Sequence, residues 1–148
     1  MTPNPQEDGV THLNVYSQGQ TSLGRFLSNF YNWIIETEDG VFDSIEGYWY
    51  WLGCEHPDRD QLRTVSGAKA KKLGRELRGK DWQSDDEFKR KICAAISLKI
   101  KSHPAKWKEL RDNTLPLAHY YVFGGKVVEP SDGAWILEHI QSVAKEQS

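Results

Sequence analysis

The sequence predicts an α+β fold, because helical and strand patterns are mixed along the chain and do not alternate strictly. Hairpin patterns cover residues 33–43 and 119–129, and helical patterns cover 66–77, 84–103 and 133–145. A chain of 148 residues is long enough for one domain with its own core but short for two. We therefore expect a loose segment over residues 1–9 and a single compact domain over 10–148, mostly helical with short antiparallel β-hairpins.

The first half of the chain is predicted to contain two strand regions followed by a short helix. Residues 10–16 alternate weakly between apolar and polar, as a strand does. The turn Glu38-Asp39-Gly40 joins two further strand patterns into a hairpin. Ser44 is a suitable helix N-cap and places Glu46 in the first turn of the next helix. There the helix dipole stabilises the carboxylate, whereas neighbouring aromatic rings raise its pKa, and the sequence leaves open which effect is larger.

The second half of the chain is predicted to be richer in helix. A basic helix over 66–77 contains Gly74-Arg75, and the capping-box pattern Ser84-Asp85-Asp86-Glu87 begins the next helix. That helix has one apolar face, made by Phe88, Ile92, Ala95 and Ile96. His103-Pro104 ends it, because the residue before a proline disfavours helical dihedral angles. A shorter helix follows, and Asp132 is predicted to cap the last one.

Composition excludes several classes of protein. The net charge of −2, from 19 basic and 21 acidic residues, argues against bulk electrostatic binding to nucleic acid but leaves a local basic patch open. Cys54 and Cys93 are isolated, so we expect free thiols in a reducing compartment. The chain has neither a signal-peptide pattern nor an apolar run of membrane-spanning length. We expect a soluble cytoplasmic protein that does not bind membranes.

Familiar cofactor and nucleophile motifs are missing from the sequence. Its five histidines show no metal-binding spacing with one another or with cysteine. No glycine-rich phosphate loop follows a strand, and no Gly-x-Ser-x-Gly motif is present. The sequence therefore predicts no metal and no cofactor.

The most informative local pattern is a carboxylate among many aromatic side chains. Glu46 is followed by Tyr48-Trp49-Tyr50-Trp51, and the upstream segment 27–33 is also aromatic and carries two amides. A carboxylate beside flat apolar rings can have a raised pKa and can face a ring-shaped ligand. The pattern indicates a site for a nucleoside or a sugar. The alternative, a helix whose aromatic rings fill the core, is the more common outcome for such a run.

The other polar candidates also have simpler explanations. Asn29 suits a turn as well as a ligand contact, and Asp132 suits a helix cap as well as catalysis. Arg75 is either a surface cation or a phosphate contact. Lys99 lies on or beside the apolar face of its helix, so its stem covers the core with the head in water, or its charge is aimed into a cleft.

Short motifs in a consistent order make the chain resemble the NADAR family (NAD- and ADP-ribose-associated, or YbiA-like) over roughly residues 23–137. The matching segments are Leu27-Ser28-Asn29-Phe30, Ser44-x-Glu46-x-Tyr48, Gly74-Arg75, Asp81-Trp82, Lys99-Ile100-x-x-His103-Pro104 and Asp132-x-x-Trp135. The chain departs from the family at Gly47, where the family has His, at Gly53, where it has Lys, and at Ile136, where it has Gly. These departures predict a divergent branch of the family, such as one carried by phages.

The resemblance implies a YbiA-like fold and hydrolysis of an N-glycosidic bond. Members of the family cleave the base–ribose bond of phosphorylated riboflavin-pathway intermediates, or remove ADP-ribose from modified guanine bases. By resemblance, this chain is an N-glycosidase acting on a ribosyl phosphate or on an ADP-ribosylated base, which can belong to DNA. The family's important acidic and aromatic positions carry over onto Glu46, Trp82 and Asp132.

Roles for individual residues follow from the resemblance and from the chemistry. Glu46 is predicted to be the main catalytic carboxylate, and Asp132 a second acid/base or a ribose anchor. Trp82 is predicted to stack the base together with Phe30 or Trp135. The remaining predicted substrate contacts are Asn29 to the base, Arg75 and Lys99 to phosphate, and Tyr48 in the matched segment.

Two other functions stay open. The absence of the family's His and Lys, at Gly47 and Gly53, favours a non-catalytic module that binds ADP-ribose or a nucleotide. A small protein-interaction domain is the third reading, in which Trp49 and Trp51 are exposed anchors for a protein partner. Burial of both tryptophans would count against that reading.

Overall fold

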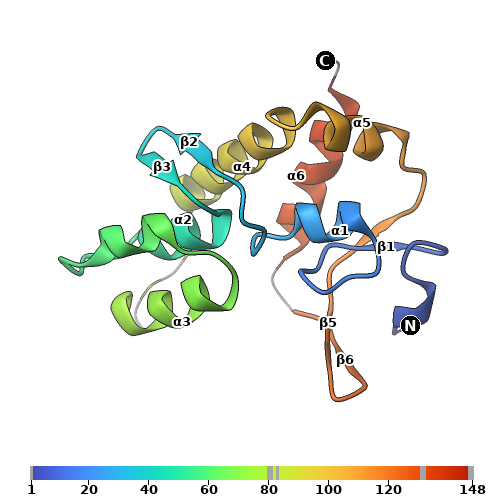
Figure 1. Ribbon diagram of the computed structural model, residues 1–148, viewed down its shortest axis with the longest axis horizontal. Coiled ribbons are helices and arrows are strands. Elements are labelled where there is room, and N and C mark those ends of the chain that lie inside the picture. The colour runs from blue at the N-terminus through green and yellow to red at the C-terminus, as the bar shows by residue number, and fades with distance from the viewer. Residues whose placement is uncertain (1, 80–81, 83, 131–132, 147–148) are drawn as a thin grey trace. The chain divides into compact units, whose positions relative to one another are not determined.

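The computed structural model describes residues 2–79, 82, 84–130 and 133–146, and Figure 1 shows the order of its elements. The chain divides into two compact units. The first contains the described residues of 1–28 and 103–148, and the second contains those of 29–102. Helices and short strands occur in both units, and each sheet of the described chain pairs two strands.

The second unit packs helices against one β-hairpin. Strands β2 (Ile35–Thr37) and β3 (Gly40–Phe42) pair antiparallel, with Ile35 opposite Phe42. The helices of this unit are α2 (Ile45–Trp51), a 3₁₀ helix (Arg59–Thr64), α3 (Gly67–Leu77) and α4 (Asp86–Lys101). The hairpin, the N-cap at Ser44 and the basic helix agree with the sequence predictions.

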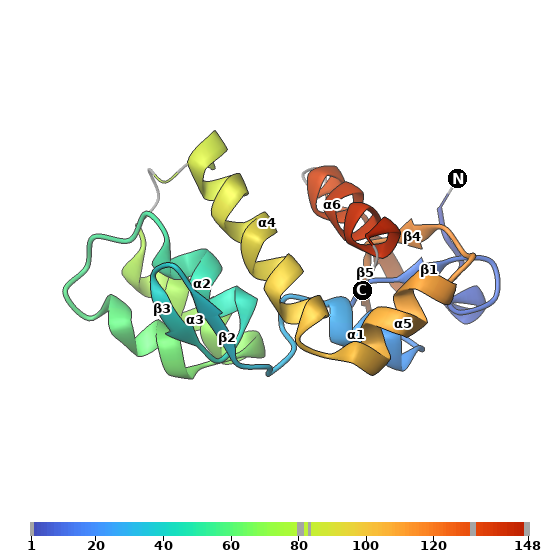
Figure 2. The same cartoon turned by 90° about the horizontal axis from the view of Figure 1, so that it is seen from above.

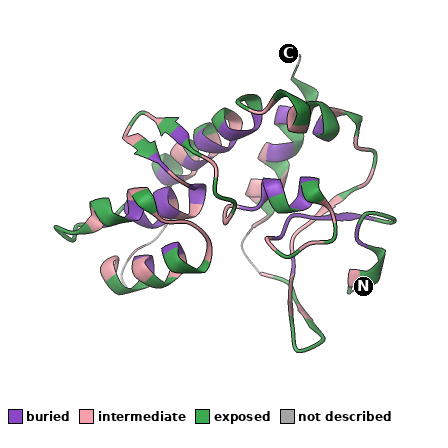
Figure 3. Cartoon of the chain, in the orientation of Figure 1, coloured by how far each residue is buried: buried purple, intermediate pink, exposed green. Residues whose placement is uncertain are grey.

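The core of the second unit forms because apolar side chains recur on one face of its helices. The four residues predicted to line α4 are all buried: Phe88, Ile92, Ala95 and Ile96. Helix α4 packs against β2, as Figure 2 shows from above. The rings of Tyr48 and Trp51, on α2, contact the ring of Phe42. Figure 3 marks the buried side of α2 and α4 in purple.

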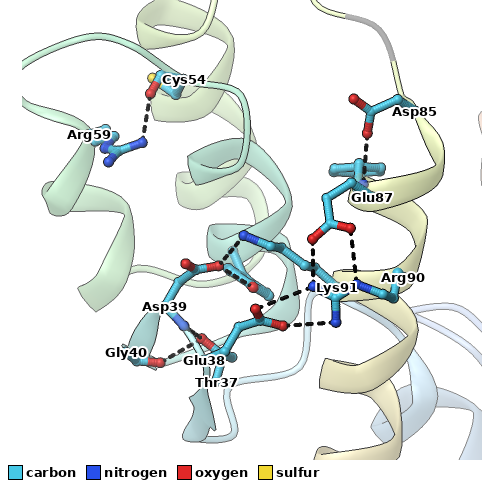
Figure 4. A network of polar contacts seen from close by, with 12 residues as sticks. Thr37, Glu38, Asp39, Gly40, Cys54, Arg59, Asp85, Glu87, Arg90 and Lys91 are labelled. Carbon is cyan, nitrogen blue, oxygen red and sulfur yellow. Dashed lines mark hydrogen bonds and ion pairs between the residues drawn. The ribbon is translucent and has the colours of Figure 1, made fainter.

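Helix α4 begins one residue later than the capping-box pattern predicts. Asp85, not Ser84, is the N-cap, and its Oδ1 accepts a backbone N–H of the first turn at 2.8 Å. Glu87 pairs with Arg90 instead of closing a capping box. Arg90 also pairs with Glu38 in the β2–β3 turn, at 3.1 Å (Figure 4). These surface ion pairs join the hairpin turn to α4.

The first unit combines helices with two small sheets. Strand β1 (Leu13–Asn14) pairs in parallel with β4 (Leu117–Ala118), and the hairpin predicted over 119–129 is formed by β5 (Tyr121–Phe123) and β6 (Lys126–Val128). Its helices are α1 (Ser22–Leu27), α5 (Pro104–Asp112) and α6 (Ala134–Lys145). His103 caps α5 and Pro104 is its first residue, whereas α4 ends at Lys101, two residues before the predicted His103.

A buried polar network holds the parallel strands of the first unit in register. Asn14 Oδ1 accepts a hydrogen bond from the Tyr120 backbone N–H, and Asn14 Nδ2 donates to the Tyr120 carbonyl, both at 3.0 Å. Asp8 accepts backbone N–H groups of Asn14 and Gln20 at 2.9 and 2.8 Å. The Tyr120 hydroxyl bonds His12 Nε2 at 2.6 Å. Each of these buried groups therefore has a partner, as stability requires.

The N-terminal part of the first unit differs from the sequence predictions. Only two residues of 10–16 form a strand, and their partner β4 lies more than a hundred residues away. The pattern gives no sign of α1, because six residues contain too few repeats of the helical period. A 3₁₀ helix (Pro5–Glu7) and the bonds to Asp8 hold part of the segment expected to be loose.

Gly133 is the N-cap of α6, and Asp132, the predicted cap, lies outside the described residues.

Candidate functional site

The start of α2 positions Glu46. The Ser44 Oγ accepts the Gly47 N–H at 3.1 Å and donates to the Val65 carbonyl at 2.8 Å, so the cap is tied to the segment before α3. The Glu46 N–H donates to the Asn29 carbonyl at 3.0 Å. These bonds satisfy free N–H groups of the first turn and direct the Glu46 side chain from a rigid helix end.

Glycines allow α2 to approach its neighbours closely. A Cβ at Gly74 of α3 would overlap the ring of Tyr50, so the absence of a side chain lets α3 pack directly against α2. A Cβ at Gly47 would overlap the Leu62 carbonyl oxygen. The helix pair therefore brings the basic face of α3 next to the acidic start of α2.

The Glu46 carboxylate is half-buried, and burial raises its pKa to about 7. Lys71, Arg78 and Arg75 of the α3 segment oppose this rise through their positive charges, in that order of size. The structure thus answers the question that the sequence left open: removal from water exceeds the favourable electrostatics. A carboxyl that titrates near neutral pH can accept or donate a proton during catalysis.

Arg78 follows α3 as its C-cap and links the carboxylate to a cleft. Its guanidinium lies 3.5 Å from the centroid of the Trp82 ring and 4.4 Å from that of Tyr50. Its Nη1 donates to the Trp49 carbonyl at 2.6 Å. The cleft has a volume of about 530 Å³ and is lined by Gly53, Glu55, His56, Leu77, Arg78, Gly79 and Trp82. Arg78 belongs to no short motif, so its part in the site is not predictable from the sequence.

Trp82 fills the space that a side chain at position 53 would need. Gly53 has a φ of +74°, and a Cβ there would overlap the Trp82 indole. The indole also contacts Phe88 edge-on, with ring centroids 4.7 Å apart. Trp82 is half-buried, so part of the ring remains accessible on the wall of the cleft.

Several predicted site residues lie near Glu46. The Asn29 carbonyl accepts the Glu46 N–H, although this contact uses the backbone and not the amide. Arg75 is exposed, hydrogen-bonds Tyr50 and acts on the Glu46 carboxylate through space. The half-buried Phe30 ring lies beside Gly67, the first residue of α3. The second unit therefore gathers these three residues around the α2–α3 pair.

Tyr48 has a structural position. Its side chain is only 1% exposed, and its hydroxyl donates to Asp39 Oδ2 at 2.7 Å. The run after Glu46 thus supplies core residues, which is the alternative that composition favours. Substrate binding by Tyr48 stays a prediction, and we leave Tyr48 out of the site proposed below.

Lys99 is buried on α4, with 2% of its surface exposed. Burial lowers the pKa of its ammonium group to about 7, and its Nζ lies 5.5 Å from the centroid of the Tyr31 ring. The ammonium head is therefore not in water, which rules out the first of the two orientations predicted from sequence. Its role as a phosphate contact stays a prediction.

Two predicted site residues belong to the first unit in sequence. Trp135 is half-buried in the first turn of α6. Asp132 lies outside the described residues. The roles of both residues in catalysis and binding remain predictions.

The two tryptophans considered as protein anchors are largely covered. Trp51 is buried, and its Nε1 donates to Asp60 Oδ1 at 3.0 Å. Trp49 is half-buried and contacts Phe88 edge-on, at 4.7 Å between ring centroids. The burial of Trp51 counts against its role as an anchor, whereas Trp49 keeps part of its surface exposed.

No group of three or more His, Cys, Asp or Glu side chains within the described ranges could hold a metal ion. No helix in the same ranges is both long enough and apolar enough to cross a membrane. Both cysteines are free thiols, and Cys54 is buried.

Comparisons with known proteins show the fold. No family model and no curated protein matches the sequence. The structure is similar to the NMR structure of the Escherichia coli protein YbiA, with a TM-score of 0.64 and 18% sequence identity. The match covers 91% of this chain and 89% of YbiA, so it includes residues of both units. The likeness confirms the predicted YbiA-like α+β fold.

Proposed function

We propose that the chain is a divergent member of the NADAR family and hydrolyses the N-glycosidic bond between a base and a ribose. The substrate class is a ribosyl phosphate or an ADP-ribosylated base, including one in DNA. The YbiA-like fold supports the family assignment at the level of architecture. The observation that carries the proposal is Glu46, a half-buried carboxyl whose pKa is raised to about 7 and on which Arg78, a residue of the cleft wall, acts through space.

The proposed reaction passes through an oxocarbenium-like sugar. The bond between C1′ and the base nitrogen breaks, and a water oxygen forms the new bond to C1′. Glu46, ionised, stabilises the developing positive charge and accepts the proton of the attacking water. The departing base takes up one proton, so base and free ribosyl compound are the products. Asp132 is the proposed source of that proton, as the sequence predicts.

The cations around Glu46 have a second use in this proposal. Lys71, Arg75 and Arg78 place positive charge beside the carboxylate, which keeps a fraction of it ionised despite burial. The same charges attract the phosphate groups of the substrate. Trp82 offers a ring for stacking the base. We propose Asn29 as the hydrogen-bonding partner of the base.

The Glu46→Gln variant tests the proposal, because it keeps the shape of the side chain and removes its charge. Wild type and variant are incubated with ADP-ribosylated DNA and with ribosylated pyrimidine phosphates, and liberated base is measured by chromatography. We expect the variant to lose about 100-fold or more of the turnover. Glu36→Gln is the matched control, since Glu36 is exposed on β2 of the same unit. Wild-type turnover by Glu46→Gln would refute the assignment.

A specific observation favours a second candidate, a module that binds ADP-ribose or a nucleotide without cleaving it. At Gly47 and Gly53, where the family has His and Lys, a Cβ would overlap the Leu62 carbonyl and the Trp82 indole. A His at position 47 or a Lys at position 53 would require its neighbours to move. Any function of this chain therefore does not use the family's His and Lys. Binding of ADP-ribose with no release of base from any of the test substrates would support this second candidate.

A further inference from the structure

We propose that Arg78 forms a phosphate-binding subsite on the wall of the Trp82 cleft, and that this residue, more than Arg75 or Lys99, selects phosphorylated ligands. The inference deepens the proposed function, on which it rests for the class of ligand. It names the residue that would recognise the phosphate monoester or diphosphate of a ribosyl compound.

Contacts within the protein hold the Arg78 guanidinium in place before any ligand binds. Its planar group lies over two rings, 3.5 Å from the centroid of Trp82 and 4.4 Å from that of Tyr50. A hydrogen bond to the Trp49 carbonyl fixes one edge, at 2.6 Å. A fixed guanidinium loses little conformational entropy when it binds an anion, so it is well suited to recognise one.

Among the described residues, most N–H donors of Arg78 have no acceptor. A guanidinium carries five N–H donors, and within the described residues Arg78 makes one hydrogen bond and no ion pair within 4 Å. Glu46 acts on Arg78 only through space. A half-buried guanidinium that is not bonded to a carboxylate can bind a phosphate by donating two parallel N–H···O hydrogen bonds to it. Burial lowers the pKa of Arg78 to about 10, so the group is still charged at neutral pH.

Arg78 is also positioned where a ligand in the cleft would reach it. Arg78 and Trp82 both line the cleft of about 530 Å³, a volume sufficient for a nucleotide-sized ligand. Arg75, the arginine singled out by the sequence motif, is exposed and does not line this cleft. Lys99, on α4, is buried, and its Nζ lies near the Tyr31 ring. His56 adds a second basic group to the lining, and Glu55 adds an opposing negative charge.

The test compares AMP with adenosine, which differ only by the phosphate, using isothermal titration calorimetry on the full chain. We expect the wild type to bind AMP about 10- to 100-fold more tightly than adenosine. Arg78→Gln should reduce this preference to about threefold or less. Arg78→Lys should keep a reduced preference, because it retains the charge but not the paired donors. Arg75→Gln should lose less of the preference than Arg78→Gln, and Lys72→Gln, an exposed position on α3, is the matched control that should keep the wild-type preference.

Glu55→Gln provides a test that does not depend on the folding of an Arg78 variant. Removal of its negative charge from the cleft should tighten AMP binding about two- to fivefold and leave adenosine binding unchanged. Equal affinity for AMP and adenosine in the wild type, or loss of the preference in Arg75→Gln but not in Arg78→Gln, would overturn the subsite. Failure of the proposed function gives a different result, since base release is measured separately on Glu46→Gln.

Discussion

Two buried polar residues of the first unit and two of the second show different ways in which a folded chain removes a polar group from water. In the first unit, Asp8 and Asn14 are buried, and the hydrogen bonds of both pair them with backbone groups. In the second unit, Glu46 and Lys99 have pKa values that burial moves to about 7 from opposite directions. No hydrogen bond or ion pair within the described residues engages the Glu46 carboxylate.

The difference separates structural from functional burial. A polar group whose bonds are all made stabilises one conformation and has no reason to change its protonation state. An ionisable group held away from water without such bonds costs stability, and proteins keep such groups mainly where they perform chemistry. This contrast is the reason that we place the main catalytic carboxylate, Glu46, in the second unit, on α2.

The largest expected effect is on the first unit. Asn14→Ala removes both bonds to Tyr120 and leaves a buried N–H and a buried carbonyl without partners. We expect a loss of about 2–5 kcal/mol in the free energy of unfolding, measured by urea denaturation. Asn32→Ala is the control, because Asn32 is exposed, and it should change stability by less than about 0.5 kcal/mol. A loss of less than about 1 kcal/mol for Asn14→Ala would contradict the claim that the buried hydrogen bonds of Asn14 stabilise the first unit.

The next effect concerns the pH dependence of stability. The pKa of Glu46 is raised from 4.5 to about 7, so between these values the folded state keeps a proton that the unfolded state has lost. The stabilisation is therefore complete below pH 4.5 and is lost as the pH rises to about 7, to a total of about 3 kcal/mol. Glu46→Gln should remove this loss and be more stable than the wild type above pH 7.

Urea denaturation at a series of pH values between 4 and 8 measures this effect, with the exposed Glu36→Gln as a control. A Glu46→Gln variant that loses stability with rising pH as steeply as the wild type would show that Glu46 is an ordinary solvated carboxylate. The electrostatic difference between the two units would then disappear.

The smallest effect is expected at the surface of the second unit. Arg90 pairs with Glu38 and Glu87, but its side chain is 53% exposed (Figure 4). Arg90→Gln should cost at most about 1 kcal/mol, and less in 1 M salt, because water and ions screen exposed pairs. Thermal denaturation at low and high salt measures it. A salt-independent loss of more than about 2 kcal/mol in the free energy of unfolding would contradict this expectation. The Arg90 ion pairs would then stabilise the fold as much as the buried hydrogen bonds of Asn14 do.

Much of the fold is predictable because its signals are local. The hairpins at 33–43 and 119–129, the cap at Ser44 and the apolar face of α4 depend on neighbouring residues alone. The start of α4 is wrong by one residue, because Ser84 and Asp85 are both good caps and only the packed chain chooses between them. The parallel β1–β4 pair is not predictable, since its partners are over a hundred residues apart.

The candidate site was predictable in part. Glu46 and Trp82 belong to short motifs, and both lie at the α2–α3 pair or its cleft. Arg78 has no motif, and its position depends on stacking with Tyr50 and Trp82. The close approach that brings α3 to Glu46 depends on Gly74 meeting the Tyr50 ring, a contact that the sequence does not reveal.

The sequence by itself determined the elements with local signals and the chemical groups available: a capped carboxylate, a basic helix and an unusual number of aromatic rings. Only the tertiary structure decided which of those rings fill the core and which line the cleft, and in which direction the pKa of Glu46 moves. The physical reason is that capping and periodicity act between neighbours in the chain. Removal from water and ring stacking depend on residues that only folding brings together.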